Sequence, residues 1–207
     1  SFRAGKVLLA EGQSFALDCA HDPRAGTVEI VGCAYAQLAQ DVKPQDRLLL
    51  ADGQIELEVQ AIDGTRIDTV VRAGGELSDR KGLNLKGGGI SAPALTDKDR
   101  VDIAFAAQQK VDYIAVSFAR NADDIVQARE LLQAAGGFGH VCAKIERHEA
   151  IYSLNEIIDA SNVVMVARGD LAVEMGYAEL TGLQKTIIHR ARHRNKVVIT
   201  ATQMMES

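Results

Sequence analysis

The segment NVVMVARGDLAVE, residues 162–174, decides the fold and locates the chemistry of this chain. Its four apolar residues, Val163 to Val166, predict a strand that is buried on both faces. The strand leads directly into Arg168-Gly169-Asp170, where the glycine lets a ligand approach the backbone and the carboxylate offers a hard oxygen to a divalent cation. The same residues are equally typical of an ordinary loop, with a glycine for the turn and an aspartate at the start of the next helix. The segment alone leaves both interpretations open.

From Thr96 onward the sequence alternates short apolar runs with helical patterns. Thr96, followed three residues later by Asp99, is typical of a helix start, and we expect Val101, Ala104 and Phe105 on the inner face of that helix. The expected strands are Tyr113–Ser117, Val141–Ile145, Val163–Val166 and Val197–Ala201. Because apolar strands that alternate with helices form parallel sheets covered on both faces, this part of the chain predicts an α/β fold.

Residues 1 to about 90 contain short strands separated by turn signals. Asp52-Gly53 and Asp63-Gly64 predict hairpin turns, and residues 54–59 alternate polar and apolar side chains, as a strand with one solvated face does. The expected strands are Lys6–Leu9, Phe15–Leu17, Val28–Ile30, Arg47–Leu50, Ile55–Val59 and Arg66–Val71. We therefore predict a small all-β unit with a barrel-like arrangement.

A glycine-rich segment, residues 80–89, follows the expected strands. It reads RKGLNLKGGG, and its three consecutive glycines indicate a flexible connection between domains. A glycine-rich segment with lysines can also hold a phosphate, although this one lacks the spacing of a P-loop. We expect two domains, an all-β domain over residues 1–86 and an α/β domain over residues 87–207.

Polar side chains follow each expected strand of the α/β part. Because ligands of parallel sheets bind at the carboxyl ends of the strands, these residues are the candidates for chemistry. They include Ser117, Lys144, Glu146, Asp170 and Thr202. Structural alternatives exist for most of them. Ser117 and Arg120 can simply be a strand end and a helix-start ion pair, and Thr202 can be a solvated or capping hydroxyl. Lys144 with Glu146 can be a surface ion pair.

The two carboxylates, Glu146 and Asp170, would repel each other in a partly dry site unless a cation lay between them. Oxygen ligands favour Mg²⁺ or Mn²⁺, and two protein carboxylates leave coordination positions open for substrate oxygens. Lys144 lies two residues before Glu146, so a continuing strand pattern places both side chains on one side. A lysine beside a metal suits the stabilisation of an oxyanion or of a transferring phosphoryl group.

The composition points to a small-molecule ligand rather than to nucleic acid or a membrane. The formal net charge is −5 for 207 residues, which gives no general attraction to polyanions. No apolar run approaches the ~18 residues of a membrane span, and the first residues lack the core of a signal peptide. The three cysteines, Cys19, Cys33 and Cys142, follow no metal-ligand spacing and fit reduced thiols in a cytoplasmic protein. Apolar neighbours favour a packing role for Cys19 and Cys142.

Several longer motifs resemble the pyruvate kinase family. They are KIERHEA (144–150), VVMVARGDLAVE (163–174), VVITATQMMES (197–207), RKGLNL (80–85) and VSF (116–118). The resemblance covers essentially the whole chain, and the order of the three longest motifs makes it specific. It implies a (β/α)8 barrel interrupted by a β-rich lid domain, with the first part of this chain as the lid and its four β/α units as barrel strands four to seven. It also implies a cytoplasmic glycolytic enzyme that transfers the phosphoryl group of phosphoenolpyruvate to ADP, giving pyruvate and ATP.

The same resemblance assigns roles to the charged residues. Glu146 and Asp170 match the carboxylates that hold the catalytic Mg²⁺, for which Mn²⁺ can substitute. Lys144 matches the lysine that stabilises the transferring phosphoryl group and the enolate that remains. Lys81 resembles a lysine near the lid hinge that contacts the nucleotide.

The remaining assignments concern the substrate and the assembly. The backbone of Gly169 and Asp170 resembles the cradle of the substrate carboxylate, and Ser117 belongs to the same substrate site. Thr202 resembles the threonine on the face where enolpyruvate is protonated. The resemblance further implies a K⁺ ion, whose ligands lie mostly in family segments outside this sequence, and a homotetramer.

Four parallel strands cannot close an eight-stranded barrel, and they leave an open edge and an exposed apolar face. We therefore expect a chain of these 207 residues alone to be inactive and to self-associate. Two other functions remain open. One is a metal-dependent oxo-acid aldolase or lyase, although enzymes of that type lack an inserted lid; the other is a non-catalytic binding fragment.

Overall fold

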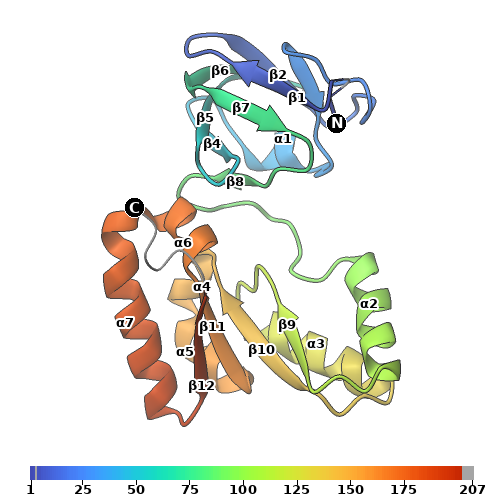
Figure 1. Cartoon of the computed structure of the whole chain (residues 1–207), viewed down its shortest axis with the longest axis vertical. Coiled ribbons are helices and arrows are strands. Elements are labelled where there is room, and N and C mark those ends of the chain that lie inside the picture. The colour runs from blue at the N-terminus through green and yellow to red at the C-terminus, as the bar shows by residue number, and fades with distance from the viewer. Residues whose placement is uncertain (3, 202–207) are drawn as a thin grey trace. The chain divides into compact units, whose positions relative to one another are not determined.

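A computed structural model describes residues 1–2 and 4–201 of the chain, and these residues form two compact units (Figure 1). The first unit is Ser1–Ala92, and the second begins at Pro93. Residues after the expected boundary at 86 still belong to the first unit because their backbone is bonded to it. Gly88 N–H donates to the Leu85 carbonyl at 2.9 Å, and Ser91 N–H donates to the Asp41 carboxylate at 2.8 Å.

The first unit consists of a six-stranded and a two-stranded sheet within the described residues. The large sheet has the order β3-β2-β6-β5-β4-β8, and β1 pairs with β7 in the small one. The elements are β1 (Lys6–Leu9), β2 (Ser14–Asp18), β3 (Ile30–Gly32), α1 (Leu38–Asp41), β4 (Arg47–Leu50), β5 (Ile55–Asp63), β6 (Arg66–Ala73), β7 (Gly75–Ser78) and β8 (Leu83–Leu85). The hydrogen bonding is thus divided between two sheets and does not form the single closed barrel that a barrel-like arrangement suggests.

Alternation of side chains builds the core of this unit. Ile55, Leu57 and Val59 of β5 are fully buried, while Glu56 and Glu58 between them face outward. Both expected hairpin turns are present, between β4 and β5 and between β5 and β6. Asp52 and Gly53 take φ values of 57° and 81°, the left-handed conformation that a tight hairpin turn requires.

Two sequence expectations in this unit are wrong. The third strand is Ile30–Gly32 rather than Val28–Ile30, because it is β2 that sets its register, with Ala16 opposite Ile30. Residues 83–85 are a strand rather than part of a linker: β8 pairs antiparallel with β4. Leu85 there is buried in the core, and its contribution outweighs the turn-forming tendency of the surrounding glycines.

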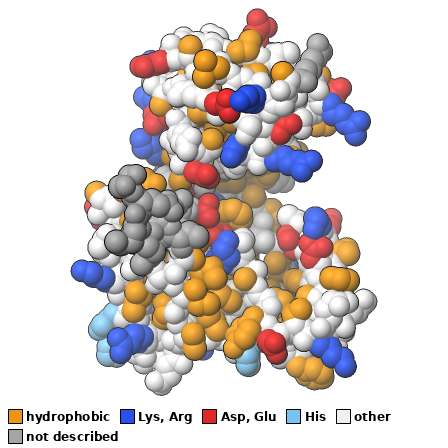
Figure 2. Space-filling model, in the orientation of Figure 1, with side chains coloured by type: hydrophobic (Ala, Val, Ile, Leu, Met, Phe, Trp, Pro, Cys, Tyr) orange, Lys and Arg blue, Asp and Glu red, His pale blue; other side chains and the backbone are white. Residues whose placement is uncertain are grey.

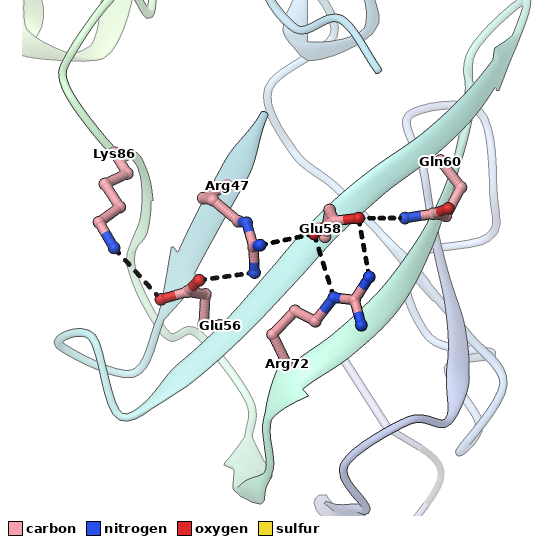
Figure 3. A network of polar contacts seen from close by, with 6 residues as sticks. All are labelled: Arg47, Glu56, Glu58, Gln60, Arg72 and Lys86. Atoms are coloured by element: carbon pink, nitrogen blue, oxygen red, sulfur yellow. Dashed lines mark hydrogen bonds and ion pairs between the residues drawn. The ribbon is translucent and has the colours of Figure 1, made fainter. Parts of the chain in front are cut away.

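Charged side chains form a network on the outer face of β4, β5 and β6 (Figure 3). Arg47 bridges Glu56 at 2.9 Å and Glu58 at 2.6 Å. Arg72 donates from Nε and Nη2 to the two oxygens of Glu58 at 3.1 and 2.9 Å, and Gln60 adds a bond of 2.8 Å. The arginines thereby offset the repulsion between Glu56 and Glu58, which lie on the same face of β5.

The second unit contains four parallel strands in the order β12-β11-β10-β9, connected by helices. Its elements are α2 (Asp97–Gln108), β9 (Tyr113–Val116), α3 (Ala122–Ala134), β10 (His140–Ile145), α4 (His148–Tyr152), α5 (Leu154–Ala160), β11 (Val163–Ala167), α6 (Arg168–Met175), α7 (Tyr177–His193) and β12 (Val197–Ala201). The α/β fold predicted from the sequence is confirmed. None of the described helices is long and apolar enough to cross a membrane.

The two faces of this sheet differ sharply. Val141, Ala143 and Ile145 point to one face and are fully buried, as are their register partners Val164 and Val166. This face packs against α3, α5 and α7, and α3 lies behind the strands in Figure 1.

The opposite face carries the alternate residues and is far more open. Tyr113, Val197 and Ile199 there are 57%, 62% and 41% exposed. Figure 2 shows hydrophobic side chains gathered over the strands on this side. Among the described residues of this unit, the helices cover the other face, so an apolar surface is left uncovered.

The helices begin where the capping residues predict, but the buried face of α2 is not the one predicted from the sequence. Thr96 and Asp99 form the expected capping box, and Asn121 caps α3 by accepting from Asp124 N–H. Val101 and Phe105, expected inward, are 69% and 60% exposed. The buried residues of α2 are Ile103 and Ala107, which belong to the same core cluster as α3.

Candidate active site

Lys144, Glu146 and Ser117 meet at the carboxyl end of the parallel sheet. Lys144 lies on β10, on the open face of the sheet, and Glu146 follows directly after that strand. The Lys144 ammonium is 2.9 Å from Ser117 Oγ and 2.9 Å from Glu146 Oε2. Side chains two residues apart on a strand share a face, which is why the lysine and the glutamate can pair. The structure brings together these three predicted site residues.

Glu146 is completely buried, which is exceptional for a carboxylate. Its Oε1 accepts a hydrogen bond of 2.7 Å from Phe118 N–H. Its Oε2 has the Lys144 ammonium as an ion-pair partner, but no well-directed hydrogen bond from the described residues. Burial raises the pKa of Glu146, the Lys144 ammonium and the Phe118 amide oppose that rise, and the nearby Asp170 charge adds to it. The site thus holds a carboxylate that needs more positive charge than one lysine supplies.

The Phe118 amide reaches Glu146 because the backbone takes an unusual conformation there. Phe118 has a φ of 55°, in the left-handed region that non-glycine residues seldom adopt. Its side chain is 46% exposed, so packing of the ring does not hold the turn. The hydrogen bond to a buried carboxylate offsets the cost of the conformation. The sequence motif VSF points to this position without predicting its backbone geometry.

Gly169 and Asp170 form the first turn of α6, which begins directly at the end of β11. The N-cap residue is Ala167, whose methyl side chain cannot accept a hydrogen bond from the helix. The first N–H groups of a helix have no partner within it, and together with the helix dipole they favour an anion. These amides therefore stand at the same end of the sheet as Glu146 and Lys144.

A divalent cation fits the donor set. Glu146 and Asp170 are close enough for the charge of one to act on the other, and Glu146 Oε2 is buried without a directed donor. No three His, Cys, Asp or Glu side chains gather around a common point in the part of the chain that the structure describes. The protein would therefore supply two carboxylates, and the remaining positions around Mg²⁺ would go to water or substrate oxygens.

A second set of contacts, which the sequence did not reveal, supports the segment after β10. Glu174 of α6 accepts a hydrogen bond of 2.6 Å from His148 N–H at the start of α4. Arg147, 4% exposed, reaches Glu149 at 3.1 Å. Glu174 thus ties the helix that carries Asp170 to the segment that carries Glu146. Its contact partner is 26 residues away, so no local sequence pattern could have indicated it.

For two predicted site residues the structure gives no position relative to this cluster. Thr202 lies outside the described residues. Lys81 belongs to the first unit, where it lines a pocket of about 510 Å³ together with Arg80 and Asp79.

The fold and the polar cluster define an α/β protein with a candidate ligand site at the carboxyl ends of parallel strands. Comparison with known proteins gives the family. The model of the pyruvate kinase barrel domain matches residues 2–207, and the chain belongs to the pyruvate kinase family. The resemblance seen in the motifs is thereby confirmed.

Individual relatives agree with that assignment. The chain is 50% identical over 210 residues to a pyruvate kinase of Haemophilus influenzae and 51% identical over 210 residues to pyruvate kinase II of Salmonella typhimurium. It is 40% identical over 206 residues to a pyruvate kinase of Geobacillus stearothermophilus. These alignments cover 100%, 100% and 98% of this chain, but 44%, 44% and 35% of the relatives. The chain thus spans less than half the length of these curated relatives.

Proposed function

We propose that the protein containing this chain transfers the phosphoryl group of phosphoenolpyruvate to ADP, forming pyruvate and ATP. The observation that carries the proposal is the Lys144 ammonium, 2.9 Å from a fully buried glutamate at the carboxyl end of the sheet. Phosphoryl transfer requires positioning and positive charge where negative charge develops, and it requires little covalent chemistry from the protein.

Glu146 and Asp170 would hold Mg²⁺ or Mn²⁺. When bound, the cation supplies Lewis-acid polarisation and neutralises charge on the substrate oxygens. Ser117 accepts a hydrogen bond from Lys144 and so holds the ammonium in place. Lys144 would stabilise the phosphoryl group in transfer and the enolate oxygen left behind. The first amides of α6, at Gly169 and Asp170, would bind the substrate carboxylate.

Two further residues complete the proposed site. Thr202 would lie on the face where the enolate carbon is protonated to give pyruvate. Lys81 would contact the nucleotide. We also propose a K⁺ requirement, a cytoplasmic location and a homotetramer for the whole protein, as the family assignment suggests.

We infer that the second unit is part of a (β/α)8 barrel and the first unit its lid. The uncovered apolar face of the four-stranded sheet supports this inference. In a closed barrel that face becomes the packed interior, and strand alternation already places Cys142, Met165 and Ile199 on it. The remaining strands would come from parts of the protein outside these residues.

The test is a coupled assay on the complete protein, following pyruvate formation from phosphoenolpyruvate and ADP with Mg²⁺. Lys144→Met should slow turnover at least ~10²-fold, the usual scale for removing one preorganised charge-stabilising group. Lys98→Met is the matched control, because Lys98 is 79% exposed on α2 and pairs with Asp102. Its turnover should equal that of the unmodified protein.

Metal binding is measured separately, by the Mn²⁺ electron-spin signal without substrate. Glu146→Gln should weaken Mn²⁺ binding, whereas Lys144→Met should not. Absence of ADP-dependent pyruvate formation would refute the phosphoryl-transfer proposal, and aldol cleavage of oxo-acids would be tested next. Full activity of Lys144→Met would refute the role of the lysine.

A further inference from the structure

We propose that Cys19 and Cys33 are a redox-active thiol pair, which peroxide converts to an intramolecular disulfide and small thiols restore. The two cysteines are 14 positions apart in the sequence and belong to the ends of neighbouring strands. The inference concerns the first unit alone and is independent of the reaction proposed above.

Strand pairing places the two residues side by side. β2 and β3 are parallel, and their last register pair is Asp18 with Gly32. Cys19 and Cys33 are the next residues on each strand, and Cys33 N–H donates to the Asp18 carbonyl at 3.1 Å, continuing the ladder. Neighbouring strands lie about 4.8 Å apart, and directly paired residues point to the same face. That spacing falls within the Cα separation that a disulfide allows.

The thiols themselves converge. Cys19 Sγ donates to the Tyr35 carbonyl at 3.2 Å, and Cys33 Sγ approaches the same oxygen at 3.8 Å. Both thiols therefore point to one and the same acceptor oxygen. Neither is in a disulfide, and both are half-buried. The packing role expected for Cys19 therefore does not describe its surroundings fully.

The pair is accessible to small reagents. Both cysteines line the pocket of about 510 Å³ that also contains Arg80 and Lys81. Cys142 offers a contrast within the same chain: it is 4% exposed, and burial raises its pKa to about 11.

The chemistry balances with a peroxide as the oxidant. The Cys19 thiolate attacks one oxygen of hydrogen peroxide, the O–O bond breaks, and Cys19 sulfenic acid and hydroxide result. The Cys33 sulfur then attacks the Cys19 sulfur, the S–O bond breaks, and water leaves with the proton of Cys33. The two sulfurs lose two electrons, and the peroxide becomes two waters. Burial raises the pKa of Cys33, which keeps it protonated and disfavours its attack on the peroxide in the first step.

A soft-metal site is the other chemistry that two thiols could serve. Such a site needs further ligands, usually four in all. Within residues 1–2 and 4–201, no group of three His, Cys, Asp or Glu side chains is placed to hold a metal ion. The geometry therefore favours oxidation between two thiols.

The experiment is disulfide mapping on the complete, reduced protein after brief exposure to a small excess of hydrogen peroxide. Remaining thiols are blocked with N-ethylmaleimide before unfolding. Trypsin cleaves after Arg24, so the two cysteines fall in separate peptides, residues 7–24 and 25–47. We expect these two peptides to be recovered as one linked species, two hydrogen masses below their sum, and to separate after dithiothreitol. Recovery of both peptides unlinked, with the thiols free or singly oxidised, would overturn the proposal.

Variants identify the order of the steps. In Cys33→Ser the sulfenic acid has no resolving thiol, so dimedone should label Cys19 after peroxide. Cys142→Ser is the matched control, and linkage between the two peptides should be unchanged. The mapping of the unmodified protein decides the proposal even if a variant fails to fold. Equal linkage to Cys142 would show non-specific oxidation and contradict it.

Discussion

The Glu58 carboxylate lies between the Arg72 and Arg47 guanidinium groups on the outer face of the first unit, and these contacts lower its pKa. Hydrogen bonds from Arg72 and then from Gln60 lower its pKa from 4.5 to about 2. A carboxylate whose pKa is lower in the folded than in the unfolded chain stabilises the fold at pH values above its pKa in the unfolded chain. That contribution is lost as the pH falls from about 4.5 through about 2.

Glu58→Gln should therefore lower the midpoint of chemical unfolding near pH 6, with a difference from the unmodified protein that shrinks towards pH 2. The measurement is a set of denaturant unfolding curves between pH 6 and pH 2 that follow the unfolding of the first unit. Arg72→Gln removes the main hydrogen-bond donors to Glu58 and should flatten the same pH dependence. A Glu58→Gln difference that is equal at pH 6 and pH 2 would mean that the carboxylate titrates normally.

At the residue scale, the sequence predicted those site residues whose signal is local. Lys144 is on β10 and Glu146 follows one residue beyond its end, so the period of the strand alone predicted that they lie together. The Phe118 amide and the Glu174 carboxylate were not predicted, because one depends on a left-handed backbone and the other on a contact across 26 residues. The Cys19–Cys33 pairing likewise depends on which strands are neighbours.

At the scale of the element, the start of α2 is held by reciprocal hydrogen bonds. Asp99 N–H donates to Thr96 Oγ1 at 3.2 Å, and Thr96 N–H donates to the Asp99 carboxylate at 2.8 Å. Thr96→Ala removes the first of these and should destabilise the second unit by about 1 kcal/mol, the usual scale for an N-cap. Unfolding midpoints in urea measure the change.

Thr186→Ala is the control, since Thr186 is an exposed threonine within α7 whose hydroxyl donates to the Gly182 carbonyl. Alanine is the better helix former there, so this variant should be no less stable than the unmodified protein. Equal losses in the two variants would show that the capping position has no special role.

Helix starts and apolar strands were predictable because both depend on neighbours in sequence. The strand β8 was missed because glycines and lysines surround Leu83–Leu85, and only pairing with β4 makes it a strand. The buried side of α2 was assigned wrongly because Val101 and Phe105 are apolar, yet Ile103 and Ala107 are the residues that join the core. A helix with apolar residues on several sides does not reveal which side its partner will contact.

At the scale of the molecule, the open face of the parallel sheet should make the 207-residue chain associate with itself. Val197 and Ile199, on the edge strand β12, are 62% and 41% exposed, and exposed apolar edges promote pairing. Sedimentation velocity at increasing protein concentration should show growing oligomers. The coupled assay on the same 207-residue chain should show no measurable pyruvate formation. Ile199→Lys places a charge on the open face and should shift the distribution towards monomer. A monodisperse monomer at all concentrations, or appreciable turnover, would contradict this expectation.

The first unit is one uninterrupted stretch of the chain, and every strand pair in it joins residues of that stretch. During translation this unit can therefore complete its contacts while residues from 93 onward are still being synthesised. The described strands of the second unit pair in parallel across long connections, which form more slowly than hairpins, and β12 is the last of them to be synthesised. The nascent chain thus passes through a period in which the first unit has made its contacts while apolar strands of the second are still exposed.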